Sequence, residues 1–314
     1  MGRYRRTVSF PNPLSPQMRP GGSASKSYHV RSVSLPCYRL HPLIPQLQEE
    51  LVGLQAWEWA QSGPCSRVVD GLTRLKGVLD SLDDVLQLPM TQDSFSSKTN
   101  VVEKLLEDFL RFVDVFGIFR ASMLGLKEEV TSAQVALRRK DDLKLTLYLK
   151  AQKKIASDIG KLISTIPVPS SNGTTNNVLN SDSDDELGYV IRDVYRATMS
   201  VSETVLRAIT GSFGLCRRPI WASFGLGKKV RKDDQAMIEE FQKVIGRVES
   251  LVELKKNNCK GEKKKNEEEV MRMGVLKAMQ ELDNCIGELE KGSERVFRSL
   301  ISTRVSLLNI LTHA

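Results

Sequence analysis

The residues best suited to chemistry lie near the start of the chain, in the stretch Arg31–Pro36 (RSVSLP). Basophilic kinases require an arginine three residues before the serine that they phosphorylate, and Arg31 stands at that distance from Ser34. A phosphate on Ser34 adds about −1.5 to −2 charges, which an arginine cluster on a reader protein can bind, and Pro36 helps to turn the chain out of the reader's groove. Phosphopeptide-binding 14-3-3 proteins read this Arg-Ser-x-Ser-x-Pro arrangement. We therefore predict a 14-3-3 docking site, against the alternative that a Ser- and Arg-rich segment matches by chance.

A second phosphorylation candidate is Ser183, within the acidic run Ser181–Glu186 (SDSDDE). Acidic residues around a serine suit an acidophilic kinase. A solvated acidic loop explains the same composition equally well, and both interpretations stay open.

The sequence contains no arrangement typical of a catalytic or metal site. The three histidines, His29, His41 and His313, lie near the two ends of the chain, which excludes a His-x-x-x-His ligand pair and a histidine-based triad in its body. Gly225–Lys229 resembles a phosphate-binding loop, but Ala222 replaces the leading glycine of that motif and Lys229 replaces its Ser or Thr. Five scattered cysteines without a Cys-x-x-Cys pair indicate free thiols in a reducing compartment. We expect no catalytic residue, no metal, no cofactor and no enzymatic activity.

The positive charge is concentrated at one end of the chain. The formal net charge is +8, yet residues 1–48 contain seven Arg and Lys residues and no acidic one, which leaves +1 for the rest. Neutral segments with interleaved Glu and Lys are typical of solvated helix faces. We therefore expect no nucleic-acid partner.

Composition divides the chain into a flexible arm and a helical body. Residues 1–41 are rich in Ser, Pro, Gly and Arg and cannot bury enough apolar area to offset the entropy of ordering. Residues 42–314 read as an all-α, elongated antiparallel bundle of long helices, with linkers at about 167–187, 213–232 and 255–265. The helices are expected at 41–61, 66–88, 98–140, 141–166, 189–213, 233–254 and 266–314, with a loop at 89–97.

Apolar residues at steps of three and four give each predicted helix one buried face. The stripes that organise the fold are Val68, Leu72, Leu75, Leu79, Leu82 and Leu86 in one helix and Met279, Leu282, Ile286, Leu289, Val296, Leu300, Leu307 and Leu311 in the last. After Asp141 and Asp142, which suit a helix N-terminus, the predicted apolar face consists of Leu143, Leu147, Ile155, Ile159, Leu162 and Ile166.

No apolar run reaches the roughly 18 to 20 residues that a membrane span requires. The segment Gly211–Lys232 combines aromatic residues with several cations, so surface attachment to a membrane through this loop and the basic arm is the alternative function. A loop that plugs the end of the bundle is the simpler interpretation.

We expect an intracellular, cytoplasmic protein. A plastid is the alternative location, because an Arg- and Ser-rich start is also typical of transit peptides.

Three stretches together resemble the plant-specific Bypass (BPS) family. They are Arg31–Pro36 followed by His41-Pro42, Ala136–Arg139 (ALRR) at the end of a long helix, and the closing stretch Phe297–Leu311 (FRSLISTRVSLLNIL). The resemblance covers about residues 30–313. It implies a non-catalytic, largely helical plant regulatory or interaction protein associated with root and shoot development, and it brings no active-site residues.

A synthetic peptide covering Ser27–His41 tests the arm directly. With Ser34 phosphorylated, it is expected to bind a 14-3-3 protein at roughly micromolar Kd, about −8 kcal/mol, and the unphosphorylated peptide far more weakly. Pro36→Ala should weaken docking, and Arg31→Ala should weaken recognition by the kinase. Equal titration of the phosphorylated and plain peptides would show that the match is a coincidence of composition.

Overall fold

The computed structural model describes residues 41–57, 62–166, 186–214, 237–256 and 262–313. All of them belong to one compact unit, Leu40–Ala314. The phosphorylation candidates Arg31, Ser34, Pro36 and Ser183 lie outside the described residues, as does most of the Gly211–Lys232 loop.

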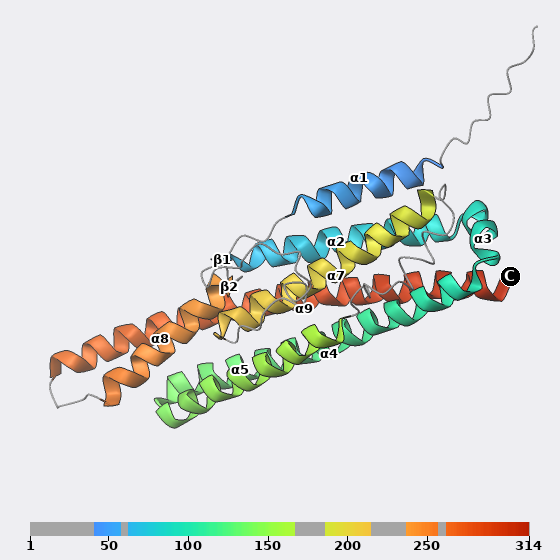
Figure 1. The fold of residues 1–314 in the computed structure, drawn as a ribbon. Coiled ribbons are helices and arrows are strands. Elements are labelled where there is room, and N and C mark those ends of the chain that lie inside the picture. Colours follow the sequence, from blue (N-terminus) through green and yellow to red (C-terminus); the bar gives the residue numbers. More distant parts are fainter. Residues whose placement is uncertain (1–40, 58–61, 167–185, 215–236, 257–261, 314) are drawn as a thin grey trace, which may run out of the picture. The chain divides into compact units, whose positions relative to one another are not determined.

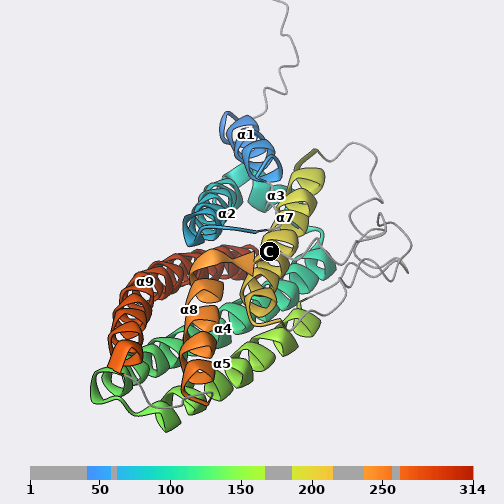
Figure 2. The ribbon, with the colours of Figure 1, turned by 90° about the vertical axis from the view of Figure 1, so that its left-hand side faces the viewer.

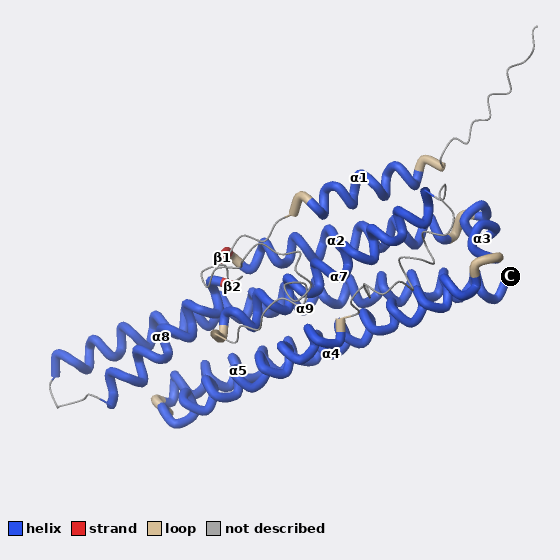
Figure 3. Tube along the Cα trace, viewed as in Figure 1, coloured by secondary structure: helices blue, strands red, loops and turns tan. Residues whose placement is uncertain are grey.

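The described residues are almost entirely helical, which confirms the all-α prediction (Figure 3). The elements are α1 (Leu43–Gln55), β1 (Ser62–Gly63), α2 (Cys65–Leu86), α3 (Pro89–Ser96), α4 (Thr99–Arg139), α5 (Asp142–Leu162), a 3-10 turn η1 (Ile163–Thr165), α7 (Glu186–Ser212), β2 (Met237–Ile238), α8 (Glu239–Lys256) and α9 (Glu262–His313).

The last helix, α9, is the central element of the bundle and contacts α2, α3, α4 and α8 (Figure 1). Its 52 residues span about 78 Å. Against α4 it runs antiparallel, because Arg120 pairs with Glu294 and Lys127 with Glu290. Against α2 it runs parallel: the Sγ of Cys65 approaches the carbonyl oxygen of Cys285, and Asp80 contacts Ser299. The central helix α9 is therefore antiparallel to α4 and parallel to α2.

The remaining helices cover this core from outside. Helix α1 packs on α2, α5 packs on α4, and α8 folds back along α9 (Figures 1 and 2). Helix α7 contacts α1, α2 and α5 and so links the two sides of the bundle. Each of the three outer pairs consists of helices that are close in sequence, whereas most contacts of α7 and the contacts of α9 with α2 and α4 join distant segments.

The predicted apolar stripes of α2 and α9 are confirmed. All six stripe residues of α2 are buried, and so are seven of the eight in α9, with Leu311 partly buried. The prediction of one long helix over 98–140 is confirmed by α4, in which Phe109, Phe116 and Phe119 are buried. The helix ends at Arg139, and the next residue, Lys140, has a left-handed backbone with φ of 60°.

Two predictions were wrong. Residues 89–97 are not a loop, because they form the short helix α3. Pro89 occupies the first position of this helix, where no hydrogen bond requires its missing backbone N–H. In the first two turns of α5 the predicted face was wrong: Leu143 and Leu147 are 73% and 53% exposed, and Leu145 and Tyr148 are buried instead. Further along, Ile159, Leu162 and Ile166 are buried as predicted. The prediction that Asp141 and Asp142 mark the N-terminus of this helix was correct, and the Asp141 carboxylate accepts a hydrogen bond from the Lys144 backbone N–H at 3.2 Å.

A two-residue parallel bridge joins the start of α2 to the start of α8. In it, Ser62 pairs with Met237 and Gly63 with Ile238. Strands this short leave no alternating pattern in a sequence, and the sequence analysis did not find them. The C-terminal part of the predicted 255–265 linker is helical, because α9 begins at Glu262. In the described part of the chain, no helix combines the length and apolar character that crossing a bilayer requires.

The substitutions Leu82→Asp and Leu300→Asp test the central packing. Each places a charge at a position that is at most 1% exposed, so each should lower the free energy of unfolding by more than about 3 kcal/mol. Leu308→Asp is the matched control for Leu300→Asp, since Leu308 also lies on α9 but is 51% exposed. Thermal melts measure all three. Unchanged midpoints for Leu82→Asp and Leu300→Asp would mean that the stripes face solvent.

Candidate functional site

A row of carboxylate–hydroxyl hydrogen bonds connects the parallel helices α2 and α9. Asp80 accepts a hydrogen bond from the Ser299 hydroxyl at 2.5 Å. One turn further along, Asp83 accepts from Ser302 at 2.8 Å and from Ser306 at 2.5 Å. We call these five residues the α2–α9 polar seam. Each bond joins residues 219 to 223 positions apart in the sequence, so the seam fixes the register of two distant helices.

The seam explains the chemistry of the closing stretch Phe297–Leu311. Its serines recur at steps of three and four on one side of α9, beside the buried apolar stripe. Asp83 and Asp84, although adjacent, lie on different faces of α2, because Asp83 contacts α9 whereas Asp84 is exposed. The sequence analysis identified no partner for either group. No local signal relates an aspartate in α2 to a serine more than 200 residues away.

Two cysteines also meet between these helices. Cys65 and Cys285 are buried free thiols, and the Sγ of Cys65 donates to the Cys285 carbonyl oxygen at 3.5 Å. Hydrogen bonding with Cys65 and burial raise the pKa of the Cys285 thiol. The backbone N–H of Cys65, at the start of α2, donates to the carboxylate of Glu240 at 3.0 Å. A buried thiol with a raised pKa carries almost no thiolate, which makes Cys285 a weak nucleophile.

A buried carboxylate lies where α4 meets α7. Asp108 is 2% exposed, and burial raises its pKa, partly offset by Lys104, whose Nζ lies 3.4 Å from its Oδ1. Burial also raises the pKa of the neighbouring Tyr195 hydroxyl, with the Asp108 charge as the next cause. Tyr195 packs edge-on against Phe112, with 5.7 Å between ring centroids. Aromatic packing and an ion pair fill this position, which indicates a structural role for Asp108.

A buried arginine joins α9 to the turn between α4 and α5. Arg272 is 4% exposed and donates from Nη2 to Asp142 at 2.8 Å and from Nε to Glu268 at 2.9 Å. Its Nη1 also reaches the Leu137 carbonyl oxygen at 3.4 Å. Lys140, in the turn itself, pairs with Glu269 at 3.0 Å. These contacts neutralise the arginine and anchor the tip of the α4–α5 hairpin.

A pocket lies between the end of α1 and the start of α2. It has a volume of about 550 Å³ and is lined by Gly53, Ala56, Trp57, Ser66, Arg67, Asp70 and Arg74. Arg74 is already bound to Asp70 at 2.9 Å and to the Gly53 carbonyl oxygen at 3.4 Å. The Trp57 indole lies so close to Gly71 that an added Cβ would be only 2.3 Å from it. The polar groups of this pocket therefore bind one another and leave no converging set of catalytic side chains.

Within the described ranges, no group of three or more His, Cys, Asp or Glu side chains is placed to hold a metal ion. His41 accepts a hydrogen bond at Nδ1 from the Leu43 backbone N–H at 3.5 Å, at the start of α1. The phosphate-loop-like residues Gly225–Lys229 lie outside the described part. What the structure assembles is a set of interhelical polar contacts with exposed helix faces around them.

Asp83→Ala and Asp84→Ala form a matched pair that tests the polar seam. Asp83→Ala removes the acceptor of two serine hydroxyls, one of them on the 5% exposed Ser306, so we expect a loss of about 1 to 2 kcal/mol. Asp84→Ala, at an exposed position, should stay within about 0.5 kcal/mol of the parent chain. Urea unfolding measures both. Equal effects of the two substitutions would show that the seam does not contribute to stability.

A comparison with protein families identifies the chain. A family model described as Protein BPS1 matches residues 71–310, from the middle of α2 to the end of α9, and so includes both helices of the seam. Searches of curated proteins and of solved structures gave no match. Because the matched residues make up well over half of the chain, this protein belongs to the Bypass family.

Proposed function

We propose that this protein is a non-catalytic regulator in plants that acts by binding other proteins, in the root and shoot development with which its family is associated. The family match over residues 71–310 carries this proposal. The described side chains support it, because the buried charges Arg272 and Asp108 each have partners of opposite charge within the fold. Groups engaged in this way are not poised for proton transfer or nucleophilic attack.

The proposed regulatory input is phosphorylation of the arm. Arg31, Ser34 and Pro36 stand at the spacing that a 14-3-3 protein reads, in a segment far from the matched family residues in sequence. The family region then provides the folded body, and the arm provides a switch that depends on a kinase. Ser183 is a second acceptor in this proposal, for an acidophilic kinase.

Complementation in a plant that lacks a Bypass-family member tests both parts of the proposal. The parent chain should restore root and shoot growth, and the unfolding variant Leu300→Asp should not. A chain with Arg67→Gln and Arg74→Gln in the pocket should restore growth as well as the parent, because the proposal assigns no chemistry to that pocket. Loss of function in the pocket variant, with a normal thermal melt, would favour an enzyme.

The arm is tested in the same plants with two neighbouring serines. Ser34→Ala should abolish co-purification of a 14-3-3 protein with the chain, whereas Ser32→Ala should still allow co-purification. Equal co-purification with the two variants would contradict the proposed regulation through Ser34, and it would leave the complementation result unchanged.

A further inference from the structure

The outer face of α5 carries an exposed apolar and basic stripe that packing within the fold does not use. Leu143, Leu147, Lys150 and Lys154 follow one another at steps of four, three and four, which places them on one line along the helix. We call these four residues the α5 outer stripe. Both leucines are more than half exposed, and both lysines are exposed. Two leucines at the most solvent-exposed positions of a helix lose the free energy of burial unless something covers them.

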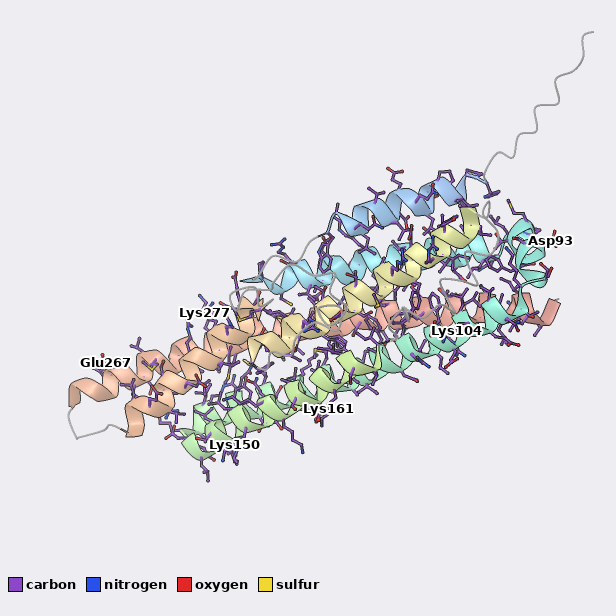
Figure 4. The ribbon with its side chains drawn as sticks, in the orientation of Figure 1. Asp93, Lys104, Lys150, Lys161, Glu267 and Lys277 are labelled. Atoms are coloured by element: carbon purple, nitrogen blue, oxygen red, sulfur yellow. The ribbon has the colours of Figure 1, made fainter. Side chains whose placement is uncertain are left out.

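The opposite face of α5 is fully used. Leu145, Tyr148, Gln152, Ala156 and Ile159 are buried against the bundle, where α5 contacts α4, α7 and α8. The outer stripe therefore lies on the crest of the helix, away from its packing partners. Figure 4 shows Lys150 and Lys161 along this edge of α5.

Cations surround the two leucines. Residues 138–161 contain eight Arg and Lys residues and three Asp residues. The acidic groups are engaged: Asp142 with Arg272, Asp141 with Lys144, and Asp158 with Lys161. Five of the cations form no ion pair with any residue in the described part of the chain, namely Arg138, Arg139, Lys150, Lys153 and Lys154.

On α4, Glu129 acts on Tyr148, which belongs to the opposite, buried face of α5. Glu269 of α9 pairs with Lys140, and Glu268 of α9 pairs with Arg272. A surplus of unpaired positive charge therefore remains around Leu143 and Leu147. Such a surface attracts a partner that offers dense negative charge next to an apolar layer.

We infer that the α5 outer stripe docks on the surface of an anionic lipid bilayer. Leu143 and Leu147 would enter the boundary between headgroups and acyl chains, and Lys150 and Lys154 would extend their ammonium groups to the lipid phosphates. The turn residues Arg138 and Arg139 would add attraction to the same charged surface. This surface differs from the arm and the Gly211–Lys232 loop, which the sequence analysis considered for membrane contact.

The shape and chemistry of the stripe favour a bilayer over a macromolecule. The stripe is convex, since it is the crest of a single helix, and a fluid bilayer adapts to a convex surface. Nucleic acid offers phosphates but no apolar layer for exposed leucines. A protein partner would need a groove that is both apolar and acidic.

A second exposed apolar pair in the same protein serves as a matched control. Val305 and Leu308 of α9 are 52% and 51% exposed, close to the value for Leu147. The arginines near them are engaged, because Arg298 pairs with Glu294 and Arg304 donates to the Leu106 carbonyl oxygen. The control pair is therefore apolar and exposed, and the two arginines nearest to it in sequence are both held by contacts within the fold.

Vesicle flotation of the full chain tests the inference. The probes are vesicles of phosphatidylcholine alone and vesicles with roughly 30% phosphatidylserine, at low and physiological salt. The parent chain should float with the anionic vesicles and not with the neutral ones. The double variants Leu143→Ser with Leu147→Ser, and Lys150→Glu with Lys154→Glu, should each weaken this binding by about tenfold or more. Val305→Ser with Leu308→Ser, and the equal charge change Lys277→Glu with Lys291→Glu, should weaken it by less than about twofold.

A depth measurement distinguishes docking of α5 from simple attraction of the basic arm. A tryptophan introduced by Leu147→Trp should be quenched by lipids brominated on their acyl chains, whereas one introduced by Leu308→Trp should not. Every altered position is exposed, so all variants are expected to fold. Thermal melts check this for each of them. The inference is overturned if the parent chain does not float with anionic vesicles, if the α5 double variants float as well as the parent, or if both tryptophans are quenched alike.

Discussion

Burial of the apolar stripe of α9 between α2 and α4 is the interaction on which the rest of the described fold depends. From Met279 to Leu307 the stripe residues are at most 2% exposed, and the helices that pack along them, α2 and α4, end at Leu86 and Arg139, 140 or more residues earlier in the chain. At about 1.5 to 3 kcal/mol for each fully buried side chain, the stripe makes a large apolar contribution to the fold. The helices α1, α5 and α8 pack on this core from outside.

Apolar burial is not directional, and it does not by itself set how far α9 slides along α2. The polar seam provides that information, because Asp80 and Asp83 bind serines of α9 at fixed positions. Each bond contributes only about 0.5 to 1.5 kcal/mol net, but a shift of one residue would break all three bonds and leave the buried Ser299 and Ser306 hydroxyls away from their carboxylate acceptors. The seam therefore specifies the register of a parallel helix pair, for which no short connecting loop is available. Membership of the Bypass family extends over both of its helices.

Much of the fold could be predicted from the sequence because periodicity is a local property. The stripes of α2 and α9 were correct residue by residue, and α4 was correctly predicted as one helix. The error in α5 has a physical cause: leucines occur at 143, 145, 147 and 149, so the pattern allows two opposite faces, and only the positions of α4 and α7 decide between them. Contacts such as Asp83 with Ser306, or Cys65 with Cys285, depend on tertiary structure and leave no local signal.

The same reasoning explains why Leu143 and Leu147, the two leucines of the α5 outer stripe, were assigned to the core. Hydrophobicity alone does not distinguish a buried leucine from an exposed one, and the mismatch appears only when the packing of the helix is known.

The most informative measurement for the account as a whole is hydrogen–deuterium exchange of the intact chain, resolved along α9. Burial of α9 between α2 and α4 predicts the slowest exchange from Met279 to Leu307, with faster exchange in the outer helices α1 and α8. Exchange in this part of α9 that is as fast as in α1 would contradict the central position of the helix.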